Sequence, residues 1–141
     1  TPVPATPAAP AAAASNAAPG SATGAPAHPD LVFLADSVFD GCATPRKPPQ
    51  APDGATATRR QMQVSQVAAR AFDAATDAYQ SCLSSAARNF MGQYGRGMDS
   101  ANLRAVDALH TRMNNAAVDI DQSVANQFNQ QLRAFNARGG H

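Results

Sequence analysis

The sequence predicts an all-α protein: a long antiparallel αα-hairpin with a short N-terminal helix and a Pro-rich extended strap, preceded by an extended or disordered Pro/Ala-rich arm. Three observations support this. Apolar residues recur every three or four positions along two long stretches, no proline interrupts either stretch, and three glycines separate them. Two helices of similar length with a short connection are expected to pack antiparallel.

The arm comprises residues 1–29. These are almost entirely Ala, Pro, Ser, Thr and Gly, with no large apolar residue beyond Val3. Such a segment favours extended, polyproline-like conformations and cannot bury a core of its own. A flexible linker and an arm that lies along a partner both remain open. The folded unit is then predicted over residues 30–141.

Residues 30–40 are predicted to form the short helix. Asp30 is placed to cap its N-terminus, and Gly41 is expected to end it in a left-handed conformation. A strand is the alternative, because residues 31–34 form a continuous apolar run.

The strap is predicted over residues 42–56, which contain four prolines and the turn sequence Pro-Asp-Gly. Thr58 and Gln61 have the spacing of a capping box, which marks the start of a helix over residues 58–91. Its predicted apolar stripe consists of Val64, Ala68, Ala71, Ala75, Tyr79, Cys82, Ala86 and Phe90.

The glycines at 92, 95 and 97 are expected to end that helix. Asp99 or Ser100 then caps a second long helix over residues 100–138, which Gly139 and Gly140 terminate. Its predicted stripe consists of Leu103, Val106, Leu109, Met113, Ala116, Ile120, Val124, Phe128, Leu132 and Phe135.

The only two cysteines, Cys42 and Cys82, are predicted to form a disulfide. Thr58 to Cys82 spans about 36 Å of helix, and a polyproline-like strap from Cys42 to Thr58 reaches nearly 50 Å at ~3.1 Å per residue. The strap can therefore run back along the first long helix. A redox or metal role is less favoured, because neither a C-x-x-C motif nor a nearby His is present. An intermolecular bridge is a lesser alternative.

A disulfide predicts an oxidising compartment, and the chain begins at Thr1 without an initiator Met. We therefore expect an exported mature chain, periplasmic or extracellular. No stretch approaches the ~20 apolar residues of a membrane span, so no transmembrane segment is predicted. A net charge of +1 does not favour nucleic acid as a partner.

Several of these residues together form a recognisable pattern. They are the run CATPRKPPQAPDG at 42–54, then Ala57, Thr58, Met62, Phe72, Asp77, Tyr79, Cys82 and Leu83, and finally Phe128, Asn129, Leu132 and Phe135. The pattern resembles small exported proteobacterial proteins of unknown function and covers about residues 42–138. The resemblance implies export and the hairpin, and it implies no activity.

Catalytic patterns are weak. His110 has Asp107 one turn before it, but no second His joins them at ligand spacing. Asp119 and Asp121 point about 200° apart on a helix, so they do not form a carboxylate pair. The serines near Cys82 have no evident base, and the Gly-rich loop lacks a phosphate-binding ending. We therefore expect no enzyme, no metal, no cofactor and no small-molecule substrate.

Two helices and a short third segment are not expected to cover all the aromatic residues. The uncovered apolar surface then predicts an interface. Its candidate residues are Phe33, Phe39, Tyr94, Arg96, Phe128 and Phe135. The second long helix is also rich in Asn and Gln, including Asn114 and Gln131, which would suit lateral packing between copies.

The sequence therefore predicts a non-enzymatic exported structural or interaction protein. Its arm and exposed apolar helix faces would engage copies of itself, as an oligomer or filament, or an envelope or extracellular assembly. The alternative is a periplasmic accessory or chaperone-like module that binds another protein.

Overall fold

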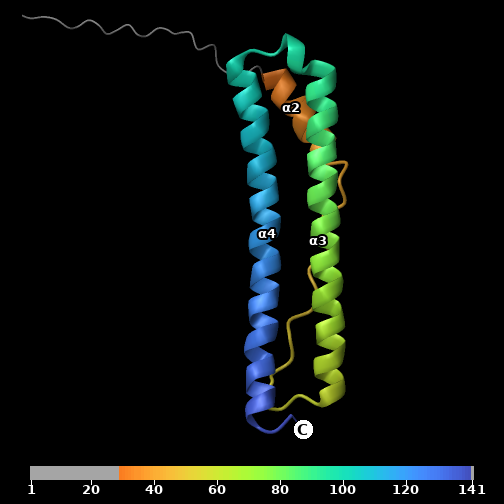
Figure 1. Ribbon diagram of the computed structural model, residues 1–141, viewed down its shortest axis with the longest axis vertical. Coiled ribbons are helices and arrows are strands. Elements are labelled where there is room, and N and C mark those ends of the chain that lie inside the picture. Colours follow the sequence, from red (N-terminus) through yellow and green to blue (C-terminus); the bar gives the residue numbers. More distant parts are fainter. Residues whose placement is uncertain (1–28, 141) are drawn as a thin grey trace, which may run out of the picture.

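The computed structural model describes residues 29–140, and within that range it is all-α (Figure 1). Helix α2 spans Pro29–Phe39, α3 spans Arg59–Tyr94 and α4 spans Ser100–Ala137. A 3-10 turn, η2, at Gly95–Gly97 joins α3 to α4, which lie antiparallel. The predicted hairpin and short helix are confirmed. The predicted arm lies outside the described residues except for its last residue.

The predicted start signals of both long helices form. The Thr58 hydroxyl accepts a hydrogen bond from the Gln61 amide at 3.1 Å, and the Gln61 side chain accepts one from the Thr58 amide at 2.8 Å. Together these bonds make a reciprocal capping box. At α4, the Asp99 carboxylate accepts from the amide of Asn102 at 3.0 Å.

The C-terminus of α4 ends in a Schellman motif. Gly139 and Gly140 adopt φ values of 90° and 72°, which residues other than glycine rarely adopt. The amide of Gly140 donates to the carbonyl of Phe135 at 3.1 Å, and that of Gly139 donates to Asn136 at 3.0 Å. The prediction that these two glycines terminate the helix is confirmed.

Three details of the predicted helix ends are wrong. Helix α3 continues through Gly92 to Tyr94, because one glycine costs a helix only about 1 kcal/mol. Helix α2 begins at Pro29, which fits a first helical position, so Asp30 lies inside the first turn. Gly41 does not adopt a positive φ. Its amide donates instead to the Val38 carbonyl at 3.2 Å, which tightens the turn.

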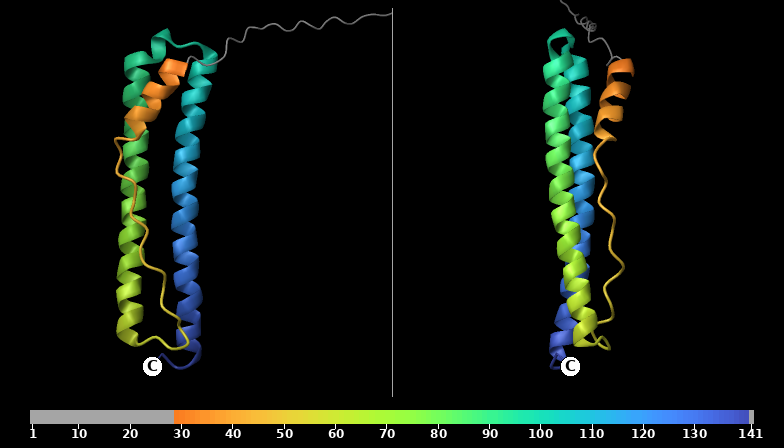
Figure 2. Two further views of the ribbon diagram at one scale, coloured as in Figure 1. Left: turned by 180° about the vertical axis from the view of Figure 1, so that it is seen from behind. Right: turned by 90° about the vertical axis from the view of Figure 1, so that its right-hand side faces the viewer.

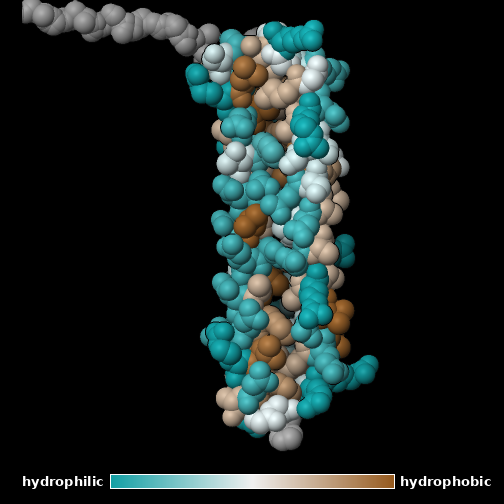
Figure 3. Space-filling view, viewed as in Figure 1, coloured by the Kyte–Doolittle hydropathy of each residue, from teal (hydrophilic) through white to brown (hydrophobic). Residues whose placement is uncertain are grey.

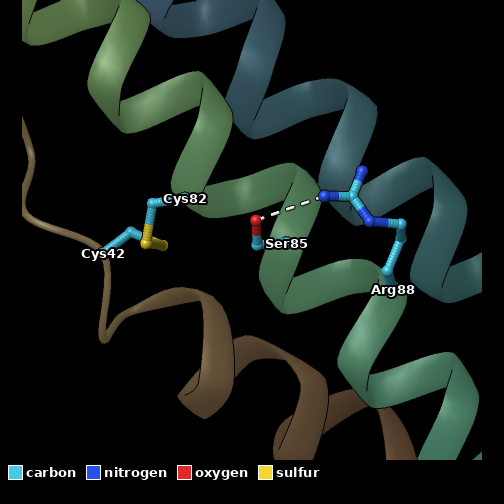
Figure 4. The surroundings of a disulfide bond; sticks show 4 residues. All are labelled: Cys42, Cys82, Ser85 and Arg88. Carbon is cyan, nitrogen blue, oxygen red and sulfur yellow. Dashed lines mark hydrogen bonds between the residues drawn. A yellow bond between two sulfur atoms is a disulfide. The ribbon is translucent and has the colours of Figure 1, made fainter.

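The strap, residues 42–56, runs antiparallel to α3 along the seam between the two long helices (Figure 2). A disulfide joins its first residue, Cys42, to Cys82 with a Cα–Cα distance of 5.7 Å (Figure 4). Helix α2 lies on the same side of the hairpin as the strap. We call this side the strap face. The predicted path of the strap and its disulfide are both present.

The apolar core is divided between the two ends of the hairpin. At the end where α2 packs, one cluster joins all three helices. At the other end, a smaller cluster joins the end of the strap to α3 and α4. The first contains Ala35, Phe39, Cys42, Tyr79, Leu83, Phe90, Met98, Val106 and Leu109, and the second contains Ala57, Met62, Phe128 and Phe135.

Polar side chains also occupy part of the seam between the two long helices. The Gln80 side chain donates to the side-chain oxygen of Asn114 at 3.0 Å, which links α3 to α4. The buried hydroxyl of Thr76 has no hydrogen-bond partner. Asn114 therefore serves the internal seam, and lateral packing between copies stays a prediction.

A close approach fastens the far end of the strap to α4. The Gly54 amide donates to the Gln131 side chain at 2.8 Å, and the Arg138 guanidinium donates to the Gly54 carbonyl at 3.0 Å and to the Ala57 carbonyl. A Cβ atom on residue 54 would lie 1.9 Å from the Gln131 carbonyl oxygen. Only glycine fits there. The Gln131 side chain, like that of Asn114, makes a hydrogen bond within the chain.

We predict that removing the disulfide strongly destabilises the fold. In the chain-entropy account, closing a loop of this length contributes about 4 kcal/mol to the free energy of unfolding. Urea denaturation of the Cys42→Ser/Cys82→Ser variant should show a loss of that order. Reductant should destabilise the natural chain and leave the double variant unchanged. A loss below about 1 kcal/mol would contradict a stabilising role.

Two glycine substitutions should act in opposite directions. Gly54→Ala should lower the free energy of unfolding by about 1–3 kcal/mol, because the added methyl group overlaps α4. Gly92→Ala is the matched control: nothing lies within 4 Å of a Cβ there, and Ala favours the helix by about 0.5–1 kcal/mol. Equal effects in thermal denaturation would rule out the close approach at Gly54.

Candidate interaction surface

The predicted interface residues do not share one exposed surface. Phe39, Phe128 and Phe135 are at least 92% buried, so their prediction as surface contacts is wrong. The physical reason is the third layer, because α2 and the strap cover the seam that a bare hairpin would expose. Phe33 is different, with 72% of its surface exposed.

The loop between the long helices holds the other two candidates. Tyr94 is half-buried, and its ring lies 4.9 Å from that of Phe90. Arg96 is exposed in the 3-10 turn. This loop carries a cationic and an aromatic side chain, and its role as an interaction surface stays a prediction.

The first half of the predicted apolar stripe of α3 is turned outward, whereas Tyr79 and Phe90 in its second half are buried. Val64, Ala71 and Ala75 are exposed, whereas Phe72 and Leu83 fill the seam. Phe72 and Leu83 each follow a stripe residue by eight positions, or about 80° around the helix. The larger side chains bury more apolar area, so they determine which side of α3 faces α4. Side-chain size is the signal in the sequence that favours the Phe72 side, although the periodicity alone does not choose between the two sides.

An apolar recess opens where the strap meets this outward side of α3. Its apolar walls are Pro49, Pro52, Val64 and Ala68, and Arg60 stands at its edge. The cavity holds about 340 Å³. We call it the Val64 recess. The sequence could not indicate it, because its walls come from two segments whose register only the folded strap sets.

The opposite face of the hairpin is largely hydrophilic, with scattered apolar residues (Figure 3). A groove between α3 and α4 is lined there by Arg70, Asp73 and Asp121. Partial burial, a hydrogen bond with Asp73, and the charges of Asp73 and Asp77 raise the pKa of Asp121 to about 6. The carboxyls are close enough to share a proton, which the sequence did not predict.

The residues weighed for catalysis do not assemble into a site. His110 is half-buried, with its ring 5.8 Å from that of Phe39. Near the disulfide, Ser85 accepts a hydrogen bond from Arg88 at 3.3 Å (Figure 4). Within residues 29–140, no group of three or more His, Cys, Asp or Glu side chains is placed to hold a metal ion.

Comparison of the chain with protein-family models, curated proteins and solved structures finds no match in any of the three. The resemblance to small exported proteobacterial proteins therefore stays an expectation. No helix in the described part of the chain is both long and apolar enough to cross a membrane.

We predict a pH dependence of stability that arises from Asp121. Its pKa rises from 3.8 to about 6 on folding, so between these values the folded state binds more protons than the unfolded state. The free energy of unfolding should then fall as pH rises from about 4 to about 7. Because solvent screens a partly exposed carboxyl, we expect a change of about 1 kcal/mol.

Asp121→Asn should flatten that dependence in urea denaturation at pH 4.5 and pH 7. Asp119→Asn is the control, because Asp119 lies about 200° around α4 from Asp121. If both variants kept the slope of the natural chain, the Asp73–Asp121 interaction would not be its source.

Proposed function

We propose that this chain is a non-enzymatic, exported interaction protein that associates through exposed apolar helix surface with copies of itself or with an envelope or extracellular assembly. One observation carries the proposal: the apolar row of α3 points away from the core. Val64 and Val67 are 60% and 68% exposed, although both are large β-branched apolar residues.

The neighbouring residues make this side of α3 suited to close packing. Ala71 and Ala75 are exposed on it, and small side chains allow another helix to approach closely. The Val64 recess adjoins the same side and adds two strap prolines to the apolar surface. Contiguous apolar surface of this kind marks interaction sites more often than isolated residues do.

The disulfide supports an oxidising location, because such bonds persist outside the cytosol. Export to the periplasm or beyond is the corresponding proposal. The Pro/Ala-rich arm is a further proposed contact, since extended proline-rich segments lose little entropy when they bind.

Light scattering across a range of concentrations tests the association. We expect an average mass above that of one chain, which falls on dilution. Val64→Ser/Val67→Ser should weaken the association about tenfold or more, because it removes exposed apolar area, while the free energy of unfolding changes little since Ser and Val have similar helix propensities.

Leu103→Ala is the control, because this residue is also exposed but lies on α4 at the other end of the hairpin. A single-chain mass at every concentration would contradict self-association and favour the alternative, a module that binds a different protein.

A further inference from the structure

Phe33, the most exposed large apolar side chain among residues 30–140, projects from the outer side of α2. The inner side of this helix carries Ala35 and Phe39, which are completely buried against α3 and α4. Phe33 lies about 160° around the helix from Ala35, so it points away from the hairpin. It therefore forms an apolar knob on the strap face.

The helix that carries this knob is acidic. Residues 30–40 contain three aspartates and no Lys or Arg. Asp36 lies one turn after Phe33 on the same side of α2, and Asp40 is exposed just beyond the end of the helix. A partner that receives the Phe33 ring would thus meet negative charge around it.

The Val64 recess has complementary properties. Its walls are apolar, its volume of about 340 Å³ accommodates an aromatic side chain, and Arg60 lines it. Arg59 and Lys47 are exposed nearby, against a single carboxylate, Asp53, among residues 47–60. A guanidinium at the edge can also pack against an aromatic ring.

The knob cannot reach the recess of its own chain. Helix α2 packs against Leu83, which is nineteen residues along α3 from Val64, or about 28 Å. Helix α2 lies toward one end of the strap face, and the part of the strap that lines the recess lies toward the other. A twofold axis that lies in the interface, perpendicular to the long axis of the hairpin, brings each knob to the recess of the other copy. Both contacts then form at once.

We propose that two copies of this chain pair antiparallel through their strap faces, each inserting Phe33 into the Val64 recess of the other. The inference rests on the proposed function and names its partner and contact. The acidic α2 of each copy then faces the basic residues around the recess of the other. The arm is a poorer occupant of the recess, because residues 1–28 contain no aromatic residue and no charged side chain apart from His28.

The expected interface has two anchors and an extended rim. An aromatic side chain buries about 150–250 Å², so two rings supply a minor part of the ~1,600 Å² of a standard interface. The facing straps would supply the rest. Anchor residues of this kind dominate affinity, whereas the surrounding contacts mainly exclude water.

Sedimentation equilibrium of the full chain tests the pairing. We expect a dimer whose dissociation constant rises at least 30-fold in Phe33→Ala, as for other anchor residues, and rises further with salt. Leu103→Ala should leave it within about threefold. Asp36→Arg and Arg60→Asp should each weaken the dimer, and the variant carrying both should recover part of the loss.

The outcomes separate this inference from the proposed function. An association that Val64→Ser/Val67→Ser weakens but Phe33→Ala does not would overturn the pairing and leave the function standing. A monomer at every concentration would overturn both. An open-ended series of masses that Phe33→Ala abolishes would overturn the twofold closure, because the contact would then run from copy to copy.

Discussion

The fold depends on the disulfide that holds the strap and α2 against the hairpin. Two helices cover each other along one side only, so a bare pair of this length would leave one side of the seam between α3 and α4 open to water. The Cys42–Cys82 bond places α2 over that seam. At the other end, the contacts of Gly54 and Arg138 fasten the strap to α4. The thin hairpin thus acquires a third layer.

This arrangement gathers the apolar clusters at the two ends of the hairpin, with Phe72 and Val124 buried between them. Polar pairs also link the two long helices: Gln80 forms a hydrogen bond with Asn114, and the Asp73 and Asp121 carboxyls interact. Polar pairs across a helix seam contribute less than buried apolar area but define which residues face each other. The same division leaves the strap face with its two unlike ends: an acidic helix bearing Phe33 and a basic recess. Association between copies would use what intramolecular packing leaves exposed.

Much of the fold could be predicted because its signals are local. The capping box at Thr58 and the Schellman glycines after α4 depend on residues a few positions apart. The disulfide could be predicted from chain length, because the extended strap is long enough to bring the only two cysteines together. The candidate surface was harder. Phe33 was identified correctly as an exposed residue, whereas Phe39 and Phe128 were assigned to the surface because the number of covering layers could not be counted from the sequence.

By itself, the sequence determined the helices, the start signals of the two long ones, their antiparallel order and the disulfide, because propensity, capping and chain length act over short distances. Only the tertiary structure decided which side of α3 is buried. Val64 and Phe72 belong to two overlapping apolar periodicities, and the choice between them depends on the volume that α4, α2 and the strap leave to fill. That choice also created the Val64 recess, whose walls meet only when the strap folds back along α3.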